Sequence, residues 1–480
     1  MAAPSGKTLF RPAAWIALAC LVVPMFASYY FDDMFSSISY LFEDPSLTQL
    51  GWDAAGYGLY ASGYSVLCVF GGLVIGGILL DKWGVRVSGS IFVGMMAAGA
   101  GIVLWALLSG VSWSLQAAYV GVMLFGLGSE IAGTAVTRSI AKWFRGGPMA
   151  LAMGLQLAIA RLGTAFALVL SPRLVAQQAG HVYVLSETAR PAVVGMGLMA
   201  LGLILWALFV ALDARADRMS EAGLSGTSAR TETTPAIDNS RGRARSDVEE
   251  SPSSTASDDE AFRFKDVLGV LGNKNFWLLG LLCVLFYSSI IAFKKFAGAI
   301  LIPRFDIPAS TAGWMVSMLP FSTVIFAPLF GMLVDKAGKG TRWMIVGSIL
   351  ALAAHLLLAF APAGVPFWGY LAMVFLGFGY SLVPAALWPS VPKIVPDKVL
   401  GTTYALIYWV QNLGLLSFKW LAGIILGASA GAAASSASYS GPVRVELMFV
   451  GLCVAALVVA LVFRRTSARH PELQLDTPNR

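Results

Sequence analysis

The chain has 480 residues, of which 57% are hydrophobic and only 12% are charged, and its formal net charge is +7 at pH 7. A soluble domain of this length cannot bury so much apolar side chain, so the composition excludes one and predicts a polytopic membrane protein. The apolar runs are about twenty residues long and do not alternate, which favours α-helices over a β-barrel.

The basic excess does not indicate nucleic-acid binding, because it comes mainly from lysine and arginine in short loops on one side of the predicted helices. The four cysteines form no CxxC pair, and with only three histidines the sequence shows no metal-ligand cluster and no nucleophile–base arrangement. We therefore expect no cofactor, no metal and no enzyme activity. We expect a monomer in the lipid bilayer that takes a small-molecule substrate.

The apolar runs form two sets of six. The first run lacks a small-residue cleavage site, so we expect it to be retained as a membrane span. The fold expected is all-α, with twelve transmembrane helices in two pseudo-symmetric six-helix bundles. The runs lie near 13–34, 56–80, 87–109, 115–141, 148–171, 191–212, 275–302, 312–334, 343–361, 366–391, 400–427 and 445–463.

A segment rich in Ser, Thr and mixed charge separates the two sets. It holds too few large apolar residues to order itself, which predicts a flexible linker. Loops rich in lysine and arginine all fall on the side of the linker, so the positive-inside bias places both termini and the linker in the cytoplasm. The predicted organisation is an N-terminal bundle at 1–212, the linker at 213–264, a C-terminal bundle at 265–464 and a tail at 465–480.

Two opposite charges lie inside the hairpin 114–172. Glu130 is in the middle of its first helix and Arg161 is in the middle of its second, each about fourteen residues, or roughly 21 Å, from the basic turn between them. A charge near the bilayer midplane costs about 3 kcal/mol, so it persists only beside a partner or a wet cavity. Either the two form a structural ion pair or they line a substrate pathway, and we favour the pathway.

Polar and aromatic residues at helical spacing extend this candidate site. Asp32 and Asp33 follow aromatic residues at the end of the first run, where they either line the outer mouth of a cavity or form a solvated helix end. Lys294 and Lys295 either face the cavity or snorkel to the interface, and snorkelling is the less costly arrangement. His355 is expected to make an interhelical contact. The further substrate-binding candidates are Tyr60, Tyr64, Gln156, Tyr380, Trp388, Tyr404, Tyr408, Gln411 and Asn412.

The spacing G-x-x-x-D-K-x-G recurs at corresponding points of the two sets of helices. The first glycine of each copy would allow close helix packing, the aspartate would accept from an arginine or a helix N-terminus, and the second glycine would permit a tight turn. This repeat resembles the loop signature of the major facilitator superfamily, whose members have two six-helix halves with the substrate site between them. The expected gating and structural residues are Gly77, Asp81, Gly84, Arg86, Arg138, Gly331, Asp335 and Gly338.

Five further stretches resemble one branch of that superfamily, the family of major facilitator superfamily domain-containing protein 1, the lysosomal dipeptide transporter. They lie at 128–130, 154–163, 328–336, 386–396 and 401–415. The resemblance implies facilitated dipeptide export without obligatory proton coupling.

The resemblance also assigns roles to the two opposite charges: Glu130 would bind the amino terminus of the substrate and Arg161 its carboxylate. Lys294, Lys295 and Lys419 depart from the family pattern. Animal members carry a sorting signal and bind a glycosylated partner subunit. This sequence shows no such signal and no glycosylation sequon, so we expect a bacterial plasma membrane, with a lysosomal membrane as the alternative. The sequence leaves open whether an accessory subunit binds.

The placement of Glu130 and Arg161 and the family resemblance both predict a dipeptide uniporter that works by alternating access. Without substrate, Glu130 and Arg161 can pair with each other, and a zwitterionic peptide then exchanges one ion pair for two. Three alternatives stay open. An organic-anion or carboxylate exchanger would use Arg161 and the lysines, a proton-coupled symporter would use Glu130 or Asp33, and a non-transporting scaffold would use the linker.

Overall fold

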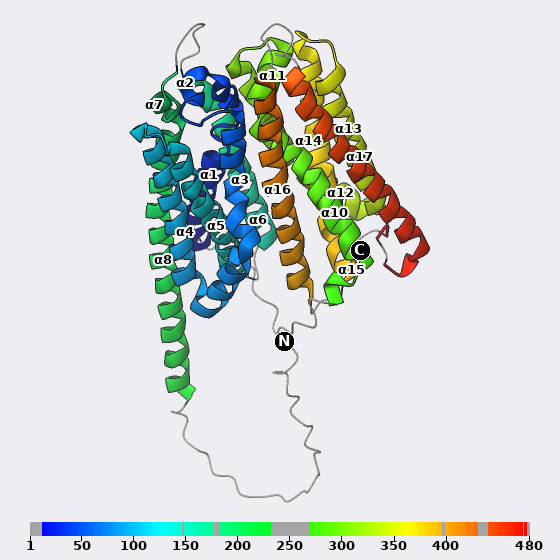
Figure 1. Ribbon diagram of the computed structural model, residues 1–480. Helices are drawn as coiled ribbons and strands as arrows, with labels where there is room; N and C mark the ends of the chain where they lie inside the picture. Colours follow the sequence, from blue (N-terminus) through cyan, green and yellow to red (C-terminus); the bar gives the residue numbers. More distant parts are fainter. Residues whose placement is uncertain are drawn as a thin grey trace, which may run out of the picture.

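The apolar runs form long helices in the computed structural model, which holds no strand among the residues it describes (Figure 1). The structure describes residues 12–145, 148–175, 183–231, 269–395, 399–430, 440–473 and 475–477. The N-terminal half contains α1 (Pro12–Asp33), η1 (Ser36–Glu43), α2 (Pro45–Thr48), α3 (Ala54–Leu67), η2 (Cys68–Gly72), α4 (Leu73–Ser109), α5 (Ser114–Trp143), α6 (Met149–Leu174), α7 (Leu185–Thr188) and α8 (Arg190–Thr231).

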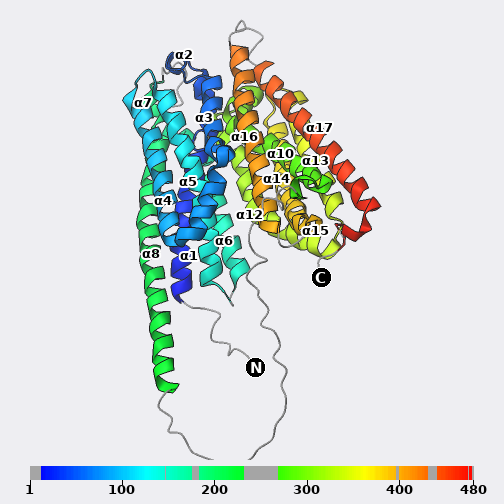
Figure 2. The same ribbon diagram turned by 60° about the horizontal axis from the view of Figure 1, so that its bottom comes forward.

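The second half of the chain forms a second bundle beside the first, as both views show (Figures 1 and 2). We call the end of the molecule where α1 begins and α8 ends the linker end, and the opposite end the far end. The second half contains α10 (Lys274–Lys295), α11 (Ala297–Phe305), α12 (Ala309–Ala337), α13 (Gly340–Phe360), α14 (Pro366–Leu387), η3 (Trp388–Ser390), α15 (Val391–Ile394), α16 (Leu400–Ala430), α17 (Ser440–Arg469) and η5 (Pro471–Leu473).

Eleven helical segments of the described chain are long and apolar enough to cross a membrane. One of them, Ala54–Ser109, has 56 residues, whereas one crossing needs only about twenty. The chain reverses direction at Gly84 within this segment. The parts before and after Gly84 pack against each other, as shown by Gly76, where an added Cβ would lie 3.2 Å from Phe92 Cζ. The eleven segments are therefore consistent with the twelve predicted crossings.

The glycines of the repeated loop motif have different roles in the structure. Gly84 has a φ of 73° and Gly338 a φ of 61°, in the region that favours glycine, so the tight turns expected there are observed. A Cβ at Gly77 or at Gly331 would meet no atom within 4 Å. The expectation that these two glycines permit close helix packing is therefore wrong for this conformation.

The charged residues of the motif lie at the linker end. Asp81 forms an ion pair with Arg138, which joins α4 to α5, and both side chains are exposed. Arg138 therefore contacts a motif residue of its own half. Asp335 is also exposed, and its charge acts on Lys393 of α15.

Helix α8 continues through 213–231, which the sequence analysis assigned to the flexible linker. Residues 232–264 of the predicted linker lie outside the described residues. The helix continues because its next turns carry charges that neighbouring helices neutralise. The predicted boundary at 213 is therefore too early.

Asp213 is the centre of this ion cluster and is 4% exposed. Its carboxylate accepts from Arg86 Nε at 2.7 Å, from Lys142 Nζ at 2.8 Å and from Trp143 Nε1 at 2.8 Å. Asp217, one turn further on, also pairs with Arg86 and Lys142. The cluster ties α4 and α5 to α8.

Asp213→Asn is expected to lower the apparent melting temperature of the purified protein by several degrees. The change removes the charge that neutralises Arg86 and Lys142, and because both cations reach water the loss is about 1–3 kcal/mol. Intrinsic tryptophan fluorescence during heating measures it. Asp217→Asn is the matched control, because Asp217 is 41% exposed and should have a smaller effect. Equal shifts for the two variants would contradict this account.

The described part of the predicted tail folds back onto the second half instead of extending away from it. Thr341 donates its backbone N–H to Asp476 Oδ1 at 2.9 Å, and Lys339 N donates to Asp476 O at 2.9 Å. Leu475 is buried beside them. The tail thus caps the first turn of α13 at the linker end.

Candidate functional site

Glu130 and Arg161 both lie in the middle of their helices, on the half-buried side of the first bundle that faces the second. Glu130 Oε1 accepts from Tyr64 Oη at 3.1 Å. Arg161 Nη1 donates to Tyr380 Oη at 3.0 Å, so it reaches across from α6 to α14 of the other half. The guanidinium also lies over the rings of Tyr29, at 5.5 Å, and Tyr380, at 5.4 Å. Two aromatic faces thus hold the arginine.

No ion pair joins Glu130 to Arg161 in the part of the chain that the structure describes. The expectation that the two groups pair in the absence of substrate is therefore wrong for this conformation. Tyr29 lies close enough to both groups for each charge to act on it, so both groups border the same region beside α1. Each charge keeps a neutral aromatic partner, which leaves it available to a charged ligand.

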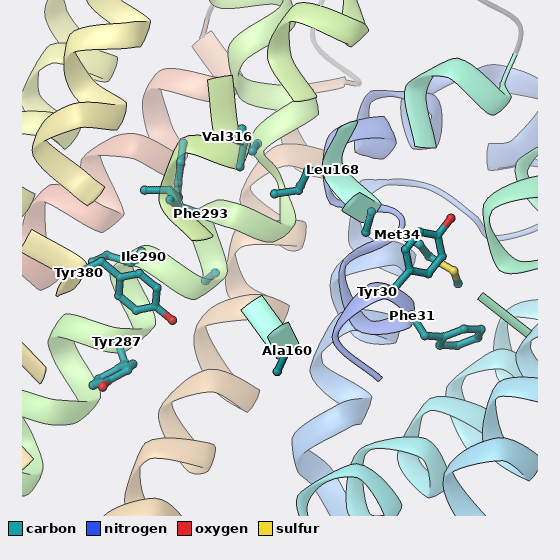
Figure 3. Close-up of a cluster of buried hydrophobic side chains, with 14 of the residues drawn as sticks. Tyr30, Phe31, Met34, Ala160, Leu168, Tyr287, Ile290, Phe293, Val316 and Tyr380 are labelled. Carbon is teal, nitrogen blue, oxygen red and sulfur yellow. The ribbon is translucent and has the colours of Figure 1, made fainter. Parts of the chain in front are cut away.

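The second half provides an aromatic wall. Trp388 stacks on Tyr408 with ring centroids 5.0 Å apart, and its Nε1 donates to Tyr287 Oη at 3.0 Å. Tyr404 Oη donates to the carbonyl of Trp388 at 3.3 Å. Figure 3 shows Tyr380 projecting from α14 toward α6. The structure therefore brings Trp388, Tyr404 and Tyr408 together, and Tyr287 lies between Trp388 and Tyr380. Their role in substrate binding stays a prediction.

Gln411 and Asn412 are 7% and 4% exposed, and Asn412 Nδ2 donates to the carbonyl of Tyr408 on its own helix. Gln156 is half-buried, toward the linker end from Arg161. None of these three amides contacts Glu130 or Arg161 through a hydrogen bond in the described residues. Their role in substrate binding stays a prediction.

The two tyrosines predicted on one face of the second helix have separate environments. Tyr64 contacts Glu130, whereas Tyr60 packs in a far-end aromatic cluster with Phe35, Trp52 and Tyr57. Tyr60 also borders a small hollow beside Asp32 and Lys295. Tyr60 is therefore placed near the far-end seam rather than beside Glu130.

Sequence reasoning missed two tyrosines that surround Arg161. Tyr29 of α1 covers its guanidinium, and Tyr287 of α10 packs against Tyr380 with ring centroids 6.0 Å apart. Both positions lie in apolar helices where aromatic residues are ordinary core residues, so nothing in the pattern marks them. The one available signal is that Tyr29 comes one turn before the acidic pair Asp32-Asp33.

Asp33 closes the seam between the two halves at the far end. Its carboxylate accepts from Lys294 Nζ at 2.6 Å, from Lys295 Nζ at 3.1 Å and from Thr164 Oγ1 at 2.7 Å. Lys295 Nζ also lies 2.8 Å from Asp32 Oδ2. Asp33 is 1% exposed and Lys295 is 2% exposed. The prediction that the two lysines snorkel to the interface is wrong, because α1 supplies counter-ions for them inside the protein. The alternative that Asp33 belongs to a solvated helix end is also wrong, because Asp33 is buried.

Backbone contacts reinforce this closure. Gly58 of α3 and Gly423 of α16 touch, since a Cβ at Gly58 would lie 2.8 Å from Gly423 Cα. Ala299 N of α11 donates to Ser39 Oγ of η1 at 3.0 Å. In each of these two contacts one segment (α3 or η1) belongs to the first half and the other (α16 or α11) to the second. Packing and charge together therefore close the far end.

A second buried pair, His355 and Glu446, lies within the second half. Nδ1 of the histidine is 2.8 Å from Oε2 of the glutamate, joining α13 to α17, and both side chains are at most 1% exposed. His355 thus makes the interhelical contact that the sequence predicts, and it has no contact with Glu130 or Arg161.

Two helical bundles with opposite charges in the middle of the membrane span and a seam between them define a polytopic membrane transporter. Residues 19–418 match the model of the Major Facilitator Superfamily. The chain belongs to this superfamily and, within it, to the family of the MFSD1 proteins.

Curated relatives carry one name, lysosomal dipeptide transporter MFSD1. The protein of Danio rerio is 29% identical over 435 residues, covering 88% of this chain and 81% of the relative. That of Mus musculus is 30% identical over 414 residues, covering 85% and 76%.

Solved structures share the fold at low identity. A bacterial homologue of the human lysosomal transporter Spinster, solved in an inward-facing and unoccupied conformation, has a TM-score of 0.64 at 12% identity, covering 98% of this chain and 99% of that one. The nucleoside transporter NupG has a TM-score of 0.60 at 15% identity, covering 94% and 98%.

Proposed function

We propose that this protein moves dipeptides across its membrane as a uniporter, by alternating access. One observation carries the proposal. Glu130 and Arg161 lie near the middle of consecutive membrane-spanning helices, and within the described chain each is held by tyrosine hydroxyls or rings instead of by a counter-ion. An intramembrane charge without a counter-ion marks a substrate pathway.

A dipeptide provides the two missing charges. Its ammonium fits Glu130 and its carboxylate fits the planar fork of Arg161, which can bind both carboxylate oxygens. Both ends of the substrate are then neutralised when the site closes, so no charge is left alone in a medium of low dielectric constant. The substrate side chains would lie against the aromatic wall of Trp388 and Tyr408.

Alternating access follows from how the contacts are divided between the halves. The first half provides both charges, while Tyr380 and the aromatic wall come from the second, so closure around a peptide requires both halves. The Asp33 cluster holds the far ends together in the conformation described here. We infer that this conformation loads or releases substrate through the linker end, which the positive-inside bias predicts to be cytoplasmic.

The structure favours the dipeptide over the rival substrates. An organic-anion exchanger would use Lys294 and Lys295 beside Arg161 and Lys419, but Asp33 and Asp32 neutralise the first two. A proton-coupled symporter would use Glu130 or Asp33. Asp33 is enclosed by two lysines and Thr164, and we assign Glu130 to the ammonium of the peptide. We therefore propose a proton-independent carrier. We also propose that it works as a monomer and lies in a bacterial plasma membrane rather than a lysosomal one.

Uptake into proteoliposomes tests the proposed function. Purified protein should accumulate labelled alanyl-alanine by counterflow when the vesicles are preloaded with unlabelled peptide, and an imposed pH step should not change the rate. Unlabelled succinate and free alanine should not compete. Competition by succinate with no effect of dipeptides would overturn the proposal in favour of an anion carrier, and a rate that follows the pH step would overturn the uniporter.

A further inference from the structure

Lys419 of α16 is a buried cation for which the structure provides no counter-ion. Its side chain is 2% exposed, and its Nζ lies 5.5 Å from the ring centroid of Tyr64. Within the described residues it has no carboxylate within ion-pair distance and no hydrogen-bond acceptor. Burying an ammonium without a counter-ion is costly, so this position calls for an anion that the protein does not supply.

The nearby carboxylates are already engaged. Asp32 and Asp33 act on Lys419 at longer range, but both are in contact with Lys294 and Lys295, so that cluster of two acids and two lysines is balanced. Glu130 is the other acidic neighbour, and it accepts from Tyr64. Among the residues that the structure describes, Lys419 is thus the one cation in excess between this cluster of acids and lysines and the substrate site.

The charges of the site give the class of substrate. Glu130 contributes one negative charge, and Arg161 and Lys419 contribute one positive charge each, so the site carries a net charge of about +1 at neutral pH. A neutral zwitterion leaves that excess in place. A dipeptide with one acidic side chain carries a net charge of about −1 and removes it.

The same contacts indicate which of the two residues of the dipeptide would carry the acidic side chain. Tyr64 touches both Glu130, through its hydroxyl, and Lys419, through its ring. Arg161 lies elsewhere, between Tyr29 and Tyr380. A peptide with its ammonium on Glu130 therefore brings the side chain of its first residue nearest to Lys419.

Resting on the function proposed above, we propose that Lys419 makes this transporter selective for dipeptides whose first residue is aspartate or glutamate. The lysine forms an ion pair with that side-chain carboxylate while Glu130 and Arg161 hold the two ends of the peptide. Lys419 is a specificity-determining residue, and it does not replace either of the other two charges.

Competition against labelled alanyl-alanine uptake tests the inference. In the wild type, glutamyl-alanine should compete at about a tenfold lower concentration than alanyl-alanine, as expected for one additional charge-assisted contact. Alanyl-glutamate should gain less, and lysyl-alanine should compete poorly. In Lys419→Met the difference between glutamyl-alanine and alanyl-alanine should fall below about twofold. Lys274→Met, which removes an exposed lysine at the linker end of α10, should keep the wild-type order.

The outcomes separate the two proposals. If the wild type takes up neither labelled alanyl-alanine nor labelled glutamyl-alanine, the dipeptide function itself fails. If it does, but glutamyl-alanine competes no better than alanyl-alanine, or Lys419→Met keeps the preference, the role of Lys419 fails alone. A larger gain for alanyl-glutamate than for glutamyl-alanine would also overturn the placement. Heat stability of Lys419→Met equal to that of the wild type shows that the variant is folded.

Discussion

Arg161→Ala and Glu130→Gln are each expected to abolish dipeptide uptake in proteoliposomes while the amount of folded protein stays unchanged. Each change leaves one charged end of the substrate in a buried site without its partner. Removing one member of a buried, hydrogen-bonded charge pair costs about 2–5 kcal/mol, which corresponds to a loss of roughly 30-fold to several thousand-fold. Uptake within about twofold of the wild type in both variants would end the proposal.

Glu187 and Arg190 provide matched controls in the same half of the protein. They form an ion pair at the far end with N···O of 3.7 Å, and their side chains are 22% and 54% exposed. Glu187→Gln and Arg190→Ala remove the same charges from a position on the surface, where an ion pair contributes little. Uptake close to that of the wild type in both controls would show that the position of the charge matters.

Blocked peptides assign each end of the substrate to its residue. In the wild type, acetylation of the amino terminus should weaken competition, because the peptide loses the charge that pairs with Glu130. Because Glu130→Gln and Arg161→Ala take up no peptide, heat stabilisation of the purified variants is measured instead. The acetylated and free peptides should stabilise Glu130→Gln equally, and amidation of the carboxyl terminus should have the corresponding effect in Arg161→Ala. Were acetylation to lose its effect in Arg161→Ala instead, the peptide would bind in the opposite direction.

The membrane-spanning helices could be predicted from sequence because each needs only a run of apolar residues of the right length. Gly84 could be placed at a turn since it lies between two such runs, and its φ of 73° agrees with that placement. The end of α8 could not, because its charged turns resemble a linker when read alone. Arg86 and Lys142, which lie on other helices, neutralise the acidic side chains of those turns. Contacts between residues far apart in the sequence cannot be predicted from the local pattern.

The candidate site shows the same limit. The depth of Glu130 and Arg161 follows from their distance to the turn, so their place at mid-membrane could be predicted. Their partners could not, because Tyr64 and Tyr380 come from other helices. The pairing of Lys294 and Lys295 with α1 depends on contacts over more than 260 residues of chain, and sequence alone favours snorkelling there.

Asp33→Asn is expected to open the far end of the seam between the two halves. The variant keeps the shape of the side chain but removes the charge that faces Lys294 and Lys295, and breaking a buried ion pair in this way costs about 3–5 kcal/mol. That cost applies only while the far ends are together, because the two lysines reach water when the halves separate. A change of that size can reverse a two-state equilibrium between closed and open forms.

Ser37 is a suitable site for measuring the opening. It is fully buried in η1, its Oγ has no hydrogen-bond partner in the described chain, and its backbone lies against Gly298 of the other half. Cysteine at this position preserves the shape of serine, and the four native cysteines are buried, so background labelling should be low. A membrane-impermeant maleimide should label Ser37→Cys slowly in the wild-type background and at least about tenfold faster with Asp33→Asn.

Two companions distinguish opening from unfolding. Asp53 lies at the same end but caps α3 locally by accepting from Gly56 N at 2.6 Å, so Asp53→Asn should keep the slow labelling rate. Asp33→Asn combined with Lys294→Met leaves Lys295 paired with Asp32, so no lysine is stranded without a carboxylate. This double variant should be as heat-stable as the wild type and should label about as slowly, because no charge is left uncompensated in the closed form. Fast labelling in the double variant as well would mean that the lost ion pair, and not stranded charge, opens the protein.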